Sequence, residues 1–235
     1  MSLFFLIIAT SLYETFTHPY SYLLVCSSIS LPFLIYPFIS SSHYNTPPPT
    51  YAHKAILYLT IYSYIGNYFY THYFYTILKA EYTFIGVRFN NVPLGMYFAT
   101  LFYFASYHAF SNCVLRFFYT HYVEGMRRNI LFTMVVVTLS YGTAFMESLS
   151  IAAFPYYRFE DRDMAYTVGS AFYGIYFLFS FPMFFFFDWE GDVKGGRRVG
   201  IWDTVVESCG CGMLILICLD LVRVLLVKVP FVMEL

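Results

Sequence analysis

Residues 167–187 read TVGSAFYGIYFLFSFPMFFFF, and this stretch decides the fold. It contains no Asp, Glu, Lys or Arg, and it is as long as the run of roughly 20 apolar residues with which a helix crosses a bilayer. Only a helix or a closed barrel satisfies every backbone polar group within hydrocarbon, and the stretch lacks the alternation of apolar and polar residues that marks a barrel strand. It therefore predicts a membrane-spanning helix.

Similar apolar windows lie on both sides of this stretch. A shorter apolar segment, 3–16, precedes them, and brief polar connections leave no room for a soluble domain between them. The sequence predicts a single all-α domain over 1–235, a polytopic transmembrane helical bundle of six to seven spans. The five further windows are at about 20–41, 55–78, 94–118, 130–153 and 204–227.

The composition indicates which classes of partner the chain can bind. Hydrophobic residues make up 59% and charged residues 11%, against roughly 25% charged residues in ordinary soluble domains. The net charge is -1, and no Lys/Arg cluster suggests nucleic acid. The expected partners are the lipid bilayer and an apolar ligand, with no obligate protein partner evident. The five cysteines lie in or beside apolar runs, so we expect them to pack as small hydrophobes.

Aromatic residues are unusually abundant, with 25 Tyr and 28 Phe. Two interfacial belts need fewer, so many of these rings must face the interior of the bundle. One explanation is packing alone. The other is a pocket for a flat, rigid hydrocarbon whose reaction passes through a carbocation, because aromatic faces attract cations without reacting with them.

Glu147 is the principal candidate for chemistry at membrane depth. Together with Ser140, Thr143 and Ser150 it forms a polar stripe along one face of an apolar helix. Burial in hydrocarbon favours the neutral, protonated carboxyl, which makes Glu147 a candidate proton donor. The alternative is an interhelical hydrogen bond that fixes packing.

Two more windows contain polar groups. Asn67 and His72 lie in the window 55–78, and His108 and Asn112 lie in the window 94–118. An intramembrane histidine can take part in proton transfer or serve as a satisfied hydrogen-bonding partner, and the sequence leaves both open.

Asp220 and Arg223 lie in the last window. They are three residues apart, so their side chains face each other on a helix. We expect a structural ion pair there.

Missing motifs exclude several kinds of catalysis. The six histidines form no HxxxH or HxxHH pair, so the ligands of a membrane di-iron oxidase are lacking. A GxGxxG fingerprint and a GxSxG elbow are also missing. What remains is proton transfer without a cofactor or a metal, which side chains can perform alone.

Collinear blocks from about residue 12 to residue 225 resemble the cycloeucalenol cycloisomerase family. The family usually has more chain ahead of the first block, which predicts that residues 1–16 are a truncated first span. The blocks are Leu12–Thr17, Tyr64–Phe74, Tyr82–Phe84, Asn90–Pro93, Tyr107-His108, Ser111-Asn112, Leu115-Arg116, Leu139–Glu147, Phe154–Tyr157, Asp161-Arg162, Phe172–Phe184 and Leu219–Leu221 with Arg223.

The resemblance implies an isomerase of the endoplasmic reticulum that opens the 9β,19-cyclopropane ring of cycloeucalenol to give obtusifoliol, a Δ8 sterol. A proton reaches C19, positive charge develops at C9, and a proton leaves C8. Under this reading Glu147 is the acid, and His72 or His108 is the base or a proton relay. The residues expected to line the sterol are Asn67, Tyr68, Tyr107, Asn112, Tyr141 and Tyr173.

Two other functions stay open on the residues alone. The chain could be a non-enzymatic sterol-binding or scaffold subunit of a membrane complex, or a small transporter with Glu147 in a proton path. Replacing Glu147 by Gln separates them, because an enzyme keeps its fold and loses turnover.

Overall fold

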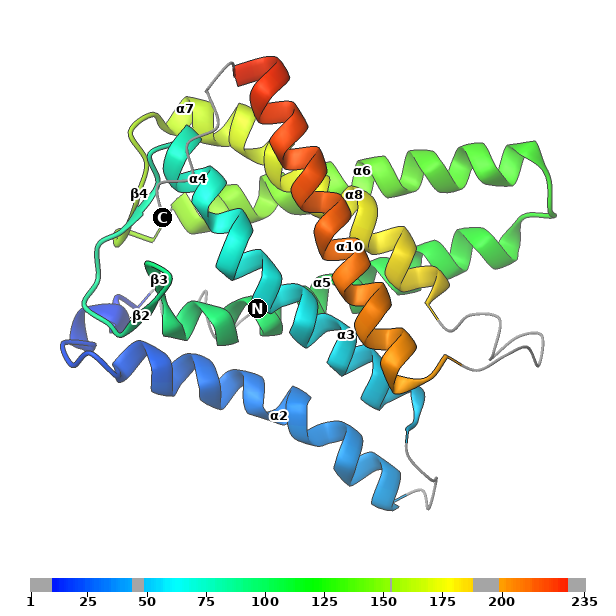
Figure 1. Ribbon diagram of the computed structural model, residues 1–235, viewed down its shortest axis with the longest axis horizontal. Coiled ribbons are helices and arrows are strands. Elements are labelled where there is room, and N and C mark those ends of the chain that lie inside the picture. Colours follow the sequence, from blue (N-terminus) through cyan, green and yellow to red (C-terminus); the bar gives the residue numbers. More distant parts are fainter. Residues whose placement is uncertain (1–9, 44–48, 153, 188–198, 228–235) are drawn as a thin grey trace.

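The computed structural model describes residues 10–43, 49–152, 154–187 and 199–227. Six long helical stretches run through these residues (Figure 1), and the short 3-10 turn η1 (Leu12–Thr15) precedes them. The stretches are α2 (Ser21–His43); α3 (Tyr51–Ile65), η2 (Gly66–Tyr70) and α4 (Thr71–Ile77); α5 (Leu94–His121); α6 (Met126–Ala152); α7 (Arg162–Met164), η3 (Ala165–Gly169) and α8 (Ser170–Phe186); and α10 (Ile201–Val222) with η4 (Arg223–Val227).

The predicted all-α class is confirmed, because each of the six apolar windows holds one of these stretches. Four of them are long and apolar enough to cross a membrane: Ser21–Ile39, Met126–Ile151, Arg162–Phe186 and Ile201–Leu225. The stretch from Tyr51 and the stretch from Leu94 are richer in Tyr and His, which lowers their hydropathy. The expected truncated span at 1–16 lies partly outside the described residues, since residues 1–9 are not described.

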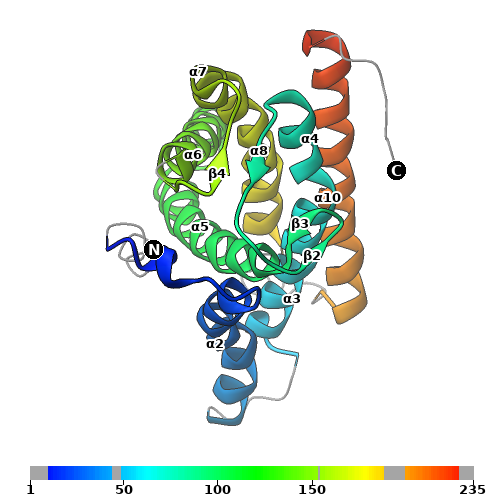
Figure 2. The ribbon, with the colours of Figure 1, turned by 90° about the vertical axis from the view of Figure 1, so that its left-hand side faces the viewer.

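Helix α8 lies at the centre of the packing. It contacts α6 along one side and α10 and α5 along others, while α2 packs against α5 and α10 packs against α3. Figure 2 shows α6 and α10 on opposite sides of α8. The main hydrophobic core follows α8, where Phe177 and Phe181 are buried against Phe104 and Tyr62.

Short strand pairs close one end of the bundle (Figure 1). Strand β1 (Glu81–Tyr82) pairs antiparallel with β4 (Tyr157–Arg158), and β2 (Arg88–Phe89) pairs antiparallel with β3 (Val92–Pro93). Between β2 and β3, Asn90 and Asn91 both have positive φ, as a tight hairpin turn requires. A second aromatic cluster lies beneath these strands, formed by Tyr22, Ala80, Phe84, Phe154 and Tyr157.

The π-helical turn η2 sets how α3 and α4 meet α10. A π turn inserts one residue and shifts the side chains that follow it. Tyr70, fully buried at the end of η2, donates a hydrogen bond of 2.7 Å to the backbone carbonyl of Gly212 in α10. A Cβ at Gly212 would lie 2.8 Å from Cδ1 of Ile65, so any side chain there would displace Ile65 between the two helices.

Candidate functional site

The carboxyl of Glu147 lies between three helices. Glu147 is on α6, one and a half turns before the end of that helix, and Tyr173 of α8 donates a hydrogen bond of 2.6 Å to its Oε2. Tyr107 of α5 is the second side-chain hydrogen-bond partner of the carboxyl. The close packing of α6 against α8 brings Tyr173 within reach, and α5 contacts both helices. The sequence therefore brings together three of its predicted site residues.

Aromatic rings pack around the two tyrosines that hold this carboxyl. Tyr107 stacks on Tyr103 with centroids 5.9 Å apart, and its edge meets Phe177 at 5.7 Å. Tyr173 lies 5.0 Å from Phe177 and 4.8 Å from Tyr176. A carboxyl beside aromatic faces can combine proton transfer with groups that stabilise positive charge.

Residues of the strand pairs extend the site toward the end of the bundle. The rings of Tyr82 and Tyr157 lie 4.4 Å apart, tilted by 34°, across the β1–β4 pair. Burial raises the pKa of Tyr82, and Tyr157, Tyr75 and Glu147 add to that shift through their charges. Tyr82 thus stays a neutral hydroxyl within electrostatic range of Glu147.

Sequence reasoning missed five of the aromatic residues described above: Tyr103, Phe177, Tyr176, Tyr82 and Tyr157. The position of Tyr103, one helical turn before Tyr107, was the available signal for one of them. Tyr82 and Tyr157 lie in the resembling blocks Tyr82–Phe84 and Phe154–Tyr157, so the resemblance was the available signal for the strand residues.

His108 is fully buried on α5 and joins it to α8. Its Nδ1 lies 2.7 Å from the carbonyl oxygen of Phe104, which can only accept, so Nδ1 carries a proton. Its Nε2 lies 3.0 Å from the hydroxyl of Ser180. Phe181 and Phe184 meet the ring edge-on at 5.1 and 5.2 Å. Both ring nitrogens therefore have partners within the bundle.

His72 lies apart from Glu147, on α4. Its ring meets Tyr75 edge-on at 5.5 Å, and its Nε2 is buried without a hydrogen-bond partner in the described part of the chain. No contact among the described residues joins His72 to the carboxyl of Glu147.

Asn67 and Tyr68 face other neighbours. The Asn67 amide donates to the carbonyl of Ser63 at 2.9 Å and accepts from Thr100 at 3.2 Å, which ties η2 to α5. The ring of Tyr68 lies 5.5 Å from Phe89 in an aromatic group on the surface.

Asn112 and Tyr141 are also separate from the carboxyl. Asn112 donates to the hydroxyl of Tyr51 at 3.4 Å. Tyr141 is exposed on α6 and stacks on Phe145 at 6.2 Å. Within the described part of the chain, neither side chain contacts Glu147.

The expected ion pair between Asp220 and Arg223 is confirmed. The guanidinium of Arg223 lies 2.7 Å from Oδ1 of Asp220, which also accepts from Tyr73 at 3.4 Å. Arg223 lies over the ring of Tyr73 as well, 5.7 Å from its centroid. The pair therefore joins the end of α10 to α4.

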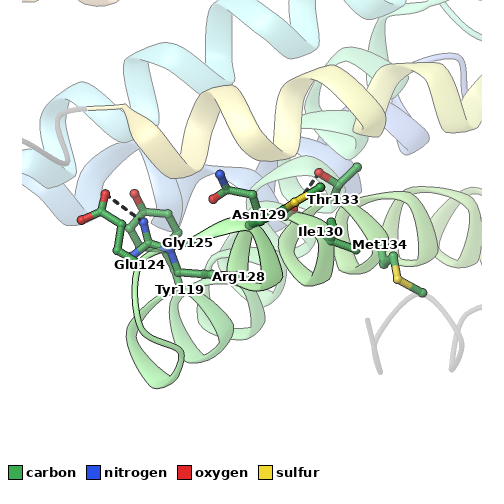
Figure 3. A pocket seen from close by; sticks show the side chains of 9 residues that line it. Tyr119, Glu124, Gly125, Arg128, Asn129, Ile130, Thr133 and Met134 are labelled. Atoms are coloured by element: carbon green, nitrogen blue, oxygen red, sulfur yellow. Dashed lines mark hydrogen bonds and ion pairs between the residues drawn. The ribbon is translucent and has the colours of Figure 1, made fainter.

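An open groove of about 810 Å³ lies at the turn between α5 and α6 (Figure 3). Arg128 lies 4.2 Å above the Tyr119 ring and 3.3 Å from Glu124 in this groove. None of the predicted site residues lines it. Among the described residues no three His, Cys, Asp or Glu side chains gather as metal ligands would.

Comparison with known proteins identifies the family to which the chain belongs. No family model and no solved structure matches the chain. Cycloeucalenol cycloisomerase of Arabidopsis thaliana is 37% identical over 227 residues, which cover 94% of this chain and 79% of that protein. An identity of this size over nearly the whole chain shows that it belongs to the cycloeucalenol cycloisomerase family.

Proposed function

We propose that this chain is a membrane-embedded sterol isomerase that opens the 9β,19-cyclopropane ring of cycloeucalenol, or of a related 9β,19-cyclosterol, to give the Δ8 sterol obtusifoliol. The observation that carries the proposal is the Glu147 carboxyl held between Tyr173 and Tyr107 among aromatic rings. A relative that is named for this reaction supports the substrate class.

The reaction needs one proton delivered and one proton removed. The protonated carboxyl of Glu147 gives its proton to C19, and the electrons of the C9–C19 bond form the new C–H bond of the angular methyl group. The cation left at C9 is neutralised when C8 loses its proton and the C8–C9 double bond forms. No electrons are gained or lost overall, so no cofactor is required.

Each residue around Glu147 has a role in this scheme. Tyr173 holds Oε2, so that Oε1 can carry the proton. The faces of Tyr107, Tyr103 and Phe177 stabilise the cation at C9 and exclude water that would trap it as an alcohol.

The base that takes the C8 proton is proposed to be a histidine. His72 has a buried Nε2 with no partner among the described residues, whereas Nε2 of His108 already faces Ser180. His72 is therefore the better acceptor, and His108 a relay through Ser180. Asn67, Tyr68, Asn112 and Tyr141 stay predicted substrate contacts, although the partners described above engage them elsewhere in the bundle.

The proposed setting is the membrane of the endoplasmic reticulum, where sterols are made. In addition to the four apolar helices, we propose that Tyr51–Ile77 and Leu94–His121 also span the bilayer, which gives six spans. Both are long enough at about 1.5 Å per residue. Buried polar side chains of both stretches are engaged by neighbouring helices, since Tyr62 and Tyr70 donate to the carbonyl oxygens of Tyr176 and Gly212, and His108 contacts Ser180.

Sterol analysis tests the proposal directly. Microsomes that express the chain are fed cycloeucalenol, and the sterols are separated by gas chromatography and identified by mass spectrometry. We expect an isomer of unchanged mass with a Δ8 bond. Unchanged substrate in membranes that contain abundant folded protein would favour a sterol-binding or scaffold subunit.

A further inference from the structure

A second cleft, of about 510 Å³, lies at the end of the bundle that the strand pairs close. It is formed where α4 ends and where β1 and the β2–β3 hairpin begin. None of the residues assigned a catalytic role lines it. The residues that do are Tyr75, Lys79, Ala80, Glu81, Tyr82, Arg88 and Asn91.

The inner walls of this cleft are apolar and fixed. Ala80 belongs to the second aromatic cluster, and Tyr75 and Tyr82 pack against that cluster. Arg88 holds two sides of the cleft together, since it donates to the carbonyl oxygens of Asn91, at 3.0 Å, and of Tyr82. The guanidinium of Arg88 is thus engaged by the protein itself.

The mouth of the cleft has two charged side chains of opposite sign. Lys79 and Glu81 are exposed, and neither side chain forms a hydrogen bond or an ion pair with another described residue. An alcohol both donates and accepts a hydrogen bond. An ammonium group that donates and a carboxylate that accepts therefore match one hydroxyl group on an otherwise apolar ligand.

The wall of the cleft continues into the strand pair that packs against the helix of the acid. Tyr82 of β1 lines the cleft, its ring lies 4.4 Å from the ring of Tyr157 in β4, and β4 contacts α6. Glu147 is five residues from Ala152 at the end of α6, which is about 7.5 Å at 1.5 Å per residue. In a cyclosterol the hydroxyl is on ring A and C19 bridges C9 and C10, where rings A and B meet. A hydroxyl at the mouth would therefore put C19 one ring deeper.

We propose that this cleft holds ring A of the sterol, with the 3β-hydroxyl between Lys79 and Glu81. The inference rests on the proposed function for the identity of the ligand. It adds a polar anchor that sets how deep the cyclopropane ring lies, and it makes Lys79 and Glu81 binding residues without a part in proton transfer.

Binding and turnover are measured separately to test this. The purified protein is placed in lipid nanodiscs, and saturable binding of radiolabelled cycloeucalenol and of its 3-O-methyl ether is compared. The test variant is Lys79→Met with Glu81→Gln. The matched control is Glu160→Gln with Arg162→Met, which removes the same two kinds of charge at the same spacing at the exposed start of α7, outside the cleft.

We expect the test variant to bind cycloeucalenol about tenfold more weakly, the equivalent of one hydrogen bond to a charged group. KM should rise by a similar factor with kcat unchanged, the methyl ether should bind wild type and variant equally, and the control should match wild type. Equal affinity of wild type and variant for the free alcohol would overturn the inference.

Other outcomes are also informative. The wild-type protein could bind cycloeucalenol more tightly than the test variant and yet isomerise no cyclosterol. That result would support the sterol site in the cleft and reject the proposed function. If the double variant does not fold, Glu81→Gln alone and the methyl ether on the wild type give the same comparison. If the wild type then binds the alcohol and the ether equally, the 3β-hydroxyl is not held by Lys79 and Glu81, and the inference is rejected.

Discussion

Replacing Glu147 by Gln removes one acidic proton and almost nothing else. The glutamine side chain has the same shape, and its amide oxygen still accepts the hydrogen bond that Tyr173 gives at 2.6 Å. We therefore expect a change of less than about 1 kcal/mol in the free energy of unfolding. An amide cannot protonate a cyclopropane carbon, and general acid catalysis contributes about 10²- to 10⁴-fold to rates.

The assay compares initial rates of Δ8 sterol formation in proteoliposomes with equal amounts of folded protein. A rate lower by about 10² to 10⁴ corresponds to about 3 to 5 kcal/mol of activation free energy. Glu147→Leu is the contrasting variant, because it leaves the hydroxyls of Tyr173 and Tyr107 without an acceptor at a cost of about 1–3 kcal/mol each. A rate for Glu147→Gln within about threefold of the wild type would refute the assignment of Glu147 as the acid.

Three further changes give measurable results. Tyr173→Phe should lower the turnover rate about tenfold without unfolding the protein, because only one hydrogen bond to Glu147 is lost; an unchanged rate would contradict its role. Gly212→Ala should lower stability in thermal unfolding by about 1–3 kcal/mol because its Cβ would meet Ile65 at 2.8 Å, while Gly210→Ala, where nothing lies within 4 Å, should not destabilise. Ser180→Ala should leave Nε2 of His108 without a partner and lower stability by about 1–3 kcal/mol; unchanged stability would argue against that bond.

The helices were predictable because a helix that crosses hydrocarbon needs a run of about 20 apolar residues, which is visible in the sequence. Each apolar window is bounded by polar residues, and each holds a helix in the structure. The π-helical turns η2, η3 and η4 and the strand pairs were not foreseen. They depend on contacts between distant segments, such as Tyr70 with Gly212, which no local pattern reports.

The candidate site was only partly predictable for a related reason. Glu147 was identified because a carboxyl at membrane depth is costly, and Tyr107 and Tyr173 because they lie in the resembling blocks. Tyr68 and Tyr141 lie in such blocks too, yet Tyr141 is exposed and Tyr68 belongs to a surface group. Sequence spacing gives the face of a helix, and only the packing of α6, α8 and α5 shows which faces meet.

The most direct test of the central claim is the origin of the new hydrogen at C19. Cycloeucalenol is converted in D₂O by the reconstituted protein, and the product is analysed by mass spectrometry and NMR. Proton delivery from the exchangeable carboxyl of Glu147 predicts a single deuterium in the angular methyl group, with the hydrogen lost from C8. A Δ8 product without deuterium at C19 would contradict protonation by an exchangeable acid and with it the role proposed for Glu147.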